Sequence, residues 1–216
     1  MKYTVKKLPL NTEPWNFGGA FSPDAICAPF DGLEEARIDL FPWLDTAPDC
    51  FLSYARVGWN EQGLTVLMYA KEYPIQSKET RMSGMQCCDS CMEFFFKPFP
   101  DEDDRFINIE INPSGIPHIG LGSGRGERRT YHEPIPGMTI TTSEYDGKYW
   151  ALCYRVPAAF LEEIYGRKLQ AGQTMKGNFY KCAEDIHRHF RTWNPVVAPH
   201  PDFHRPECFA DLVLEG

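Results

Sequence analysis

Alternating apolar and polar residues mark the centre of the chain as a pair of β-strands. Residues 89–112 read DSCMEFFFKPFPDEDDRFINIEIN, which is two alternating runs around a turn rich in Pro and Asp. One face of the two runs is apolar and consists of Met92, Phe94, Phe96, Ile107, Ile109 and Ile111. The opposite face carries Glu93, Asn108, Glu110 and Asn112. We therefore expect one face to build a core and the other to bind a ligand.

Similar patterns predict further strands and one short helix. The expected strands cover residues 52–59, 64–70, 138–145, 149–156, 178–181 and 210–214. Asp146 and Gly147 separate two of these runs, and this dipeptide accepts the positive φ angles of a tight hairpin. Pro157 and Gly166 bracket the run AAFLEEIY, which predicts a helix.

The remaining stretches are poor in periodic patterns. Residues 1–50 hold six of the eighteen prolines, which predicts an extended leader packed on the core with one strand near residues 35–40. Residues 113–136 are rich in Gly, Pro, Arg and Ser and predict a long loop over the sheet. Its run GLGSGRG, residues 120–126, fails the spacing of a nucleotide-binding loop and is expected to be a flexible flap.

Short strands, recurring hairpin turns and a single helix predict an all-β fold. We expect an antiparallel β-sandwich, immunoglobulin-like or jelly-roll-like, with one short helix and long loops. No repeat or linker divides the 216 residues, so a single domain covering residues 1–216 is expected.

Charge and composition exclude several classes of function. The net charge of −8 lacks the clustered Lys and Arg that a nucleic-acid partner requires. No run approaches the roughly 20 apolar residues of a membrane span, and no secretory signal follows the N-terminus, so we expect a cytoplasmic protein without a membrane partner. The eight cysteines are then expected to be free thiols. The oligomeric state stays open.

Seven segments, taken in order, resemble the family 9 carbohydrate-binding modules that are associated with xylanases. They read VGWNEQGLTVLMYAKE, DSCMEFFFKP, FINIEINPSG, YWALCYRVP, GNFYKCAED, TWNP and PDFHRPECFADLVL. The resemblance implies a β-sandwich that binds an oligo- or polysaccharide, often at a chain's reducing end, between aromatic rings and polar groups of adjacent strands. It matches Glu93 and Asn112 to the family's acidic residue and asparagine. The chain departs from xylanase-borne members at Glu110, where they carry an arginine, and at residues 85–88, where they place a Trp.

The predicted ligand-binding residues are Glu93, Asn108, Glu110, Asn112, Trp193 and His204. Carboxylates accept hydrogen bonds, and amides both donate and accept them. The polar face can therefore form paired hydrogen bonds with neighbouring sugar hydroxyls. Trp193 is the best aromatic candidate, although we favour the interpretation in which it closes the open end of the sandwich with Phe203 and Phe209. We expect non-catalytic carbohydrate binding without catalytic residues. The alternatives are a glycan hydrolase that uses Glu93 and Glu110, and a structural or partner-binding sandwich without a small ligand.

No cofactor or metal is assigned from the sequence. Calcium is left open because the turn at residues 101–104 supplies carboxylate oxygens. A zinc site is a less favoured alternative, and its candidate ligands are Cys87, Cys88, Cys91, Cys182, His187 and His189. The spacing of these residues lacks a second zinc knuckle, so buried or surface thiols are the competing interpretation.

Overall fold

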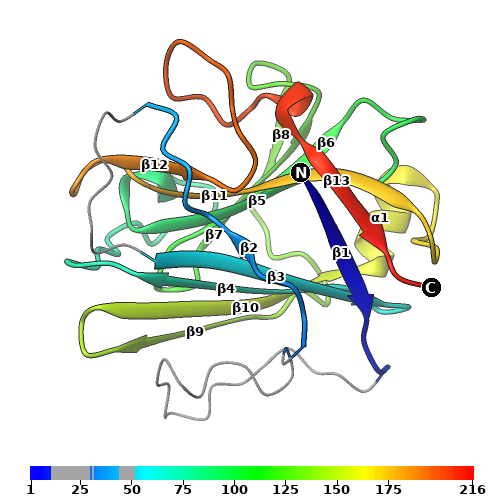
Figure 1. Cartoon of the computed structure of the whole chain (residues 1–216), viewed down its shortest axis with the longest axis horizontal. Helices are drawn as coiled ribbons and strands as arrows, with labels where there is room; N and C mark the ends of the chain where they lie inside the picture. Colours follow the sequence, from blue (N-terminus) through cyan, green and yellow to red (C-terminus); the bar gives the residue numbers. More distant parts are fainter. Residues whose placement is uncertain (11–29, 31, 44–51) are drawn as a thin grey trace.

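The computed structural model describes residues 1–10, 30, 32–43 and 52–216 and consists mainly of β-strands (Figure 1). The strands are β1 (Lys2–Lys7), β2 (Ala36–Arg37), β3 (Leu52–Asn60), β4 (Gly63–Lys71), β5 (Cys91–Lys97), β6 (Phe106–Ile111), β7 (Pro117–Gly122), β8 (Arg128–Tyr131), β9 (Ile140–Tyr145), β10 (Tyr149–Pro157), β11 (Thr174–Ala183), β12 (His189–Thr192) and β13 (Ala210–Leu214). The helical elements are η2 (Gln86–Cys88), α1 (Ala158–Tyr165) and η3 (Pro206–Cys208).

The strands form two layers that face each other (Figure 1). One layer holds β3, β4, β10 and β9, and the other holds β11, β5, β6 and β7. Their neighbouring strands pair antiparallel. β1 joins the layers, because its residues 2–5 pair parallel with β13 and its residues 6–7 pair parallel with β3. The predicted antiparallel β-sandwich is confirmed, with β1 as a parallel connection between the sheets.

The main hydrophobic core lies between the two layers and includes the apolar face predicted on β5 and β6. Each of the six predicted side chains is at most 1% exposed. The ring of Phe94 stacks on Phe96 at 4.6 Å and on Phe179 of β11 at 4.7 Å between centroids. Alternation then places Glu93, Asn108 and Glu110 on the outer face of this sheet, as predicted.

The outer face is not open along its whole length. The chain between β12 and β13 folds over it and contributes Val196, Phe203 and Phe209 to a second apolar cluster, with Phe95 and Tyr180 from the sheet below. The rings of Tyr180 and Phe203 stack with 4.2 Å between centroids. We call residues 193–209 the C-terminal cover.

The predicted hairpins and helix are confirmed. β3 and β4 pair around residues 61–62, and β9 and β10 pair around a turn in which Asp146 has φ 53° and Gly147 has φ 59°. Helix α1 ends at Gly166, which adopts the left-handed conformation with φ 67°. Phe160 and Leu161 anchor the helix in the main core.

Two sequence-based predictions are wrong for physical reasons. Residues 113–136 are not a long loop, because they contain strands β7 and β8. Glycines in β7 mimic a loop in composition, but a Cβ at Gly122 would collide with the backbone of Glu127 on the neighbouring segment. Residues 2–7 are not a leader, since they form the strand β1 between the sheets. The strand expected near residues 35–40 is confirmed as the short β2.

Some predictions concern residues outside the described ranges. The rest of the leader, residues 11–29, 31 and 44–50, lies there, together with Cys27 and Cys50. The described cysteines are free thiols, as predicted, and they are Cys87, Cys88, Cys91, Cys153, Cys182 and Cys208. Among the described residues, the helices are too short and too polar to cross a membrane.

A buried ion pair links the two layers through the core. Lys181 of β11 reaches across to Glu72, which follows β4, with 2.9 Å between Nζ and Oε2. Lys181 is 1% exposed, and its Nζ also donates to the carbonyl of Cys182. Glu72 accepts a second hydrogen bond, at 2.5 Å, from the indole of Trp150. Both charges are therefore compensated inside the protein, as a buried pair requires.

Removing only one partner of this pair should be costly. We expect Lys181→Met to lower the free energy of unfolding by about 3–5 kcal/mol, because it leaves the Glu72 carboxylate buried without a cation. Combining it with Glu72→Gln, which keeps an acceptor for Trp150, should recover most of that loss. Urea unfolding measures both. Lys148→Met removes an exposed ion pair and should cost less than about 1 kcal/mol.

Candidate functional site

A cavity of about 140 Å³ lies on the outer face of β5 and β6, beside the C-terminal cover. Its polar lining residues are Glu93, Glu110, His118, Arg125, Arg128, Glu184, Asp202 and His204. Phe190 and Phe203 provide aromatic surface, and Met85 stands exposed at its rim. Acidic groups, basic groups and rings therefore meet in one small space.

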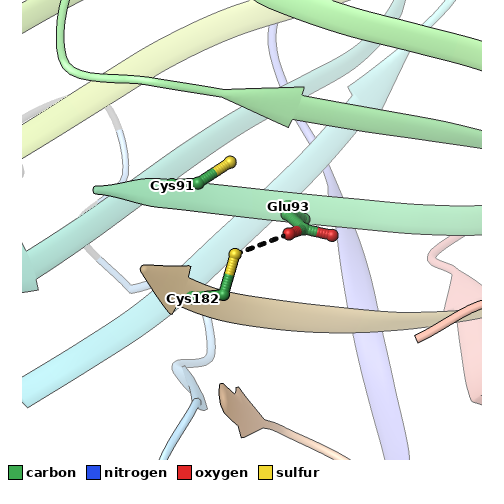
Figure 2. Close-up of side chains that lie close together, drawn as sticks. All are labelled: Cys91, Glu93 and Cys182. Carbon is green, nitrogen blue, oxygen red and sulfur yellow. Dashed lines mark hydrogen bonds between the residues drawn. The ribbon is translucent and has the colours of Figure 1, made fainter. Parts of the chain in front are cut away.

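Two carboxyl groups form the floor of the cavity. Glu93 and Glu110 are directly opposite each other in the register of β5 and β6, and both are buried. Desolvation, followed by the charge of Glu110, raises the pKa of Glu93 well above its usual value. Cys182 donates a hydrogen bond from Sγ to Oε1 of Glu93 at 3.0 Å (Figure 2). The site thus favours the neutral form of Glu93.

Glu110 has two polar neighbours, Asn108 on the same strand and Arg128 on β8. Asn108 donates from Nδ2 to Oε1 of Glu110 at 2.9 Å, and the Arg128 guanidinium lies 4.0 Å from the same oxygen. Gly120 of β7 faces Asn108, and a Cβ there would collide with the amide oxygen. The Asn108 amide therefore fits only because glycine occupies position 120. Its hydrogen bond fixes the direction of the Glu110 carboxylate.

His204 forms the wall of the cavity on the side of the C-terminal cover. Its ring packs edge-on against Phe95 with 4.9 Å between centroids, and Arg128 donates from Nη1 to its Nε2. Burial, followed by the charge of Arg128, lowers the pKa of His204 to about 2. The imidazole is therefore neutral at ordinary pH and accepts a hydrogen bond from the guanidinium.

The other predicted site residues lie away from the cavity. Asn112 is buried and bonds to Asp89, to the carbonyl of Glu79 and to the amide of Ile116. Trp193 is 6% exposed and packs in the main core against Tyr3. The positions of Asn112 and Trp193 indicate that both stabilise the fold. Binding of a ligand by either residue stays a prediction. Asn108 contacts Glu110 from below but does not line the cavity.

The candidate metal ligands are divided between different parts of the fold. Cys91 and Cys182 lie together with Glu93 on the outer face of the sheet (Figure 2). His189 bonds instead to Lys181 and to the carbonyl of His187, which places it away from those thiols. The predicted set of cysteines and histidines therefore does not converge on one point.

The turn at residues 101–104 was the calcium candidate. Its carboxylates face basic side chains, since Asp103 pairs with Arg105 and Asp104 pairs with Lys97. Calcium at this turn stays a prediction.

Sequence reasoning did not connect Cys182, His118 and Asp202 with the polar face. The missing signal for Cys182 was the length of β11, which extends to Ala183 and pairs Cys182 with Cys91. Counting by twos from Tyr180 would have placed this thiol beside Glu93. His118 belongs to the unpredicted β7, and Asp202 reaches the site only through the tertiary fold of the C-terminal cover.

Comparisons with known proteins agree with this architecture. The model of carbohydrate-binding family 9 matches residues 30–214. The chain is 26% identical to a "putative carbohydrate-binding protein" from Bacteroides uniformis, with a TM-score of 0.80 and 99% of each chain covered.

Two solved structures of a family 9 module from Caldicellulosiruptor kristjanssonii share the fold. One is a complex with cellotriose, at 12% identity and a TM-score of 0.67, covering 100% of this chain and 94% of that one. The other is a complex with glucose, at 12% identity and a TM-score of 0.62, covering 99% and 96%. A comparison with curated proteins gives no match.

The depressed pKa of His204 predicts that acid destabilises the fold. The unfolded histidine, with a pKa near 6.5, takes up a proton between pH 7 and pH 5, whereas the buried folded one does not. His204→Asn should therefore reduce the fall in unfolding free energy between these pH values by up to about 2 kcal/mol. Urea unfolding at both pH values measures it. The exposed His132→Asn is the control, and an equal reduction there would contradict the assignment.

Proposed function

Because the chain belongs to carbohydrate-binding family 9, we propose that it binds carbohydrate without cleaving it, in the cavity above Glu93 and Glu110. The observation that carries this proposal is the convergence of hydrogen-bonding groups of both kinds on one cavity of a rigid sheet. Glu110 accepts, Arg128 donates, and the neutral acid favoured at Glu93 does both. Sugar hydroxyls need such mixed partners, because each donates and accepts.

The size of the cavity suggests how much of a sugar it takes. At about 140 Å³ it is smaller than the roughly 300–1,000 Å³ of pockets for drug-sized ligands. We therefore infer a site for one sugar unit, either a monosaccharide or the end of a chain, rather than a groove along a polysaccharide. The rest of a longer chain would extend past Met85 at the rim.

The aromatic neighbour in this proposal is Phe203 or Phe190 rather than Trp193. Both phenylalanines line the cavity, whereas Trp193 lies in the main core. Phe203 is fixed by its stack on Tyr180, so its position needs no rearrangement on binding. An aromatic ring packs against the apolar face of a pyranose, while the polar floor forms hydrogen bonds with its hydroxyls.

The cations give the site a preference among sugars. Arg125 and Arg128 line the cavity together with Asp202, which pairs with Arg125 at 2.9 Å. Arg128 is committed to His204 and lies near Glu110. Because these cations already face carboxylates, we infer that neutral sugars bind better than acidic ones.

A glycan array followed by calorimetry on the hits tests the proposal. We expect binding to neutral mono- or oligosaccharides, and we expect Glu110→Gln to weaken it about 10- to 100-fold by removing a charged acceptor worth roughly 1.5–3 kcal/mol. Glu144→Gln, on the exposed part of β9, is the matched control and should bind like the original protein. The absence of binding to every sugar tested would refute the proposal.

The same hits distinguish a binder from a hydrolase. Glu93 and Glu110 stand opposite each other, which is the arrangement a glycosidase would also use. Incubation of each bound oligosaccharide followed by product analysis should show no cleavage. If products form and Glu93→Gln abolishes their formation, the protein is an enzyme and the binding proposal is wrong.

A further inference from the structure

We propose that Cys91, Glu93 and Cys182 form a binding site for a zinc-class divalent ion at the floor of the cavity. The Sγ atoms of the two thiols and a carboxylate oxygen of Glu93 all lie within 4.8 Å of one another, and all three residues are buried. Figure 2 shows the Cys182 thiol and the Glu93 carboxylate directed toward each other, with Cys91 next to them on the same strand as Glu93. This site goes beyond sugar binding, and it shares Glu93 with the proposed sugar site.

The distances suit one tetrahedral ion. Zinc lies about 2.3 Å from sulfur and about 2.0–2.2 Å from a carboxylate oxygen, so its ligand atoms are roughly 3.3–3.8 Å apart. The Cys182 thiol and the Glu93 oxygen are 3.0 Å apart, and the third ligand atom is within 4.8 Å of both. Small rotations of the side chains therefore suffice to surround an ion, without movement of the strands.

The fold holds these three side chains in place. Cys91 and Cys182 are paired across β5 and β11, and Glu93 follows Cys91 by two residues, so all three point to the outer face. Glu93 and Cys182 also line the cavity. An ion bound here would have three protein ligands and a fourth position toward the cavity, which is the arrangement of an open zinc site.

The ligand set selects the kind of ion. Thiolates favour zinc-class ions over calcium or magnesium, which take oxygen ligands only. Two thiolates and one carboxylate carry three negative charges, which a divalent ion offsets in part. Arg125 and Lys181 act on this group with positive charge, and each also pairs with a carboxylate of its own.

A purely structural cluster is the weaker explanation. Two small apolar residues would fill the space beside Glu93 without placing three titratable groups together in the interior. A disulfide between Cys91 and Cys182 is the other alternative, because the two residues are paired across neighbouring strands. Both alternatives predict that the protein does not bind metal ions at this position.

The test is a titration of the whole, reduced protein with Zn²⁺ and with Co²⁺ under anaerobic conditions. We expect one ion per chain, a thiolate-to-cobalt charge-transfer absorption, and the release of about three protons as the two thiols and the neutral carboxyl of Glu93 ionise. Cys91→Ser and Cys182→Ser should each weaken the affinity by more than about 100-fold. Cys153→Ser is the matched control, since Cys153 is buried in a different cluster on β10.

Several outcomes would overturn the proposal. These are no binding of either ion, cobalt binding without the sulfur absorption, unchanged affinity in both cysteine variants, or a Cys91–Cys182 disulfide in the anaerobically purified protein. The cobalt spectrum of the unmodified protein keeps the test decisive if a variant fails to fold. Glu110→Gln should lose sugar affinity while it retains the ion, so failure of this site and failure of the sugar site are separable.

Discussion

Strand alternation in β5 and β11 is the constraint on which the rest of the structure depends. Successive side chains must point to opposite faces, so the inner set closes the sandwich while the outer set is free to differ in chemistry. On β11, Phe179 and Lys181 face the opposing sheet, and Cys182 faces the cavity. A slip of one residue would bury the carboxyl of Glu93 in the main core, so the packing of the core also fixes the register of the site.

The C-terminal cover turns the outer face from a solvated surface into a site. Its Phe203 and Phe209 pack over the sheet, and its residues 201–204 form one wall of the cavity. The partial seal lowers the local dielectric, which explains why the pKa of Glu93 rises and that of His204 falls within the same space. The proposed sugar site and the proposed ion site both include this partly sealed floor.

The sequence predicts what depends on local pattern and misses what depends on distant partners. The two faces of β5 and β6, the hairpin at Asp146 and the end of α1 at Gly166 follow from periodicity and turn chemistry. Strand β7 is not predicted from the sequence because its glycines read as a loop. These glycines are required by close contacts with the side chain of Asn108 and the backbone of Glu127. The meeting of Cys182 with Glu93, and the burial of Trp193, follow from pairing between segments far apart in the chain.

The position of β1 sets the order in which the sandwich can close. It is synthesised before both of its partners, which are β13 and, in the opposite layer, β3. Until residue 214 has emerged, the first strand has only two residue pairs available, on β3, and the seam between the sheets stays open. Such long-range pairing slows folding and exposes unpaired strand edges during synthesis. The seam between the two sheets therefore closes late in folding, when β1 meets β13.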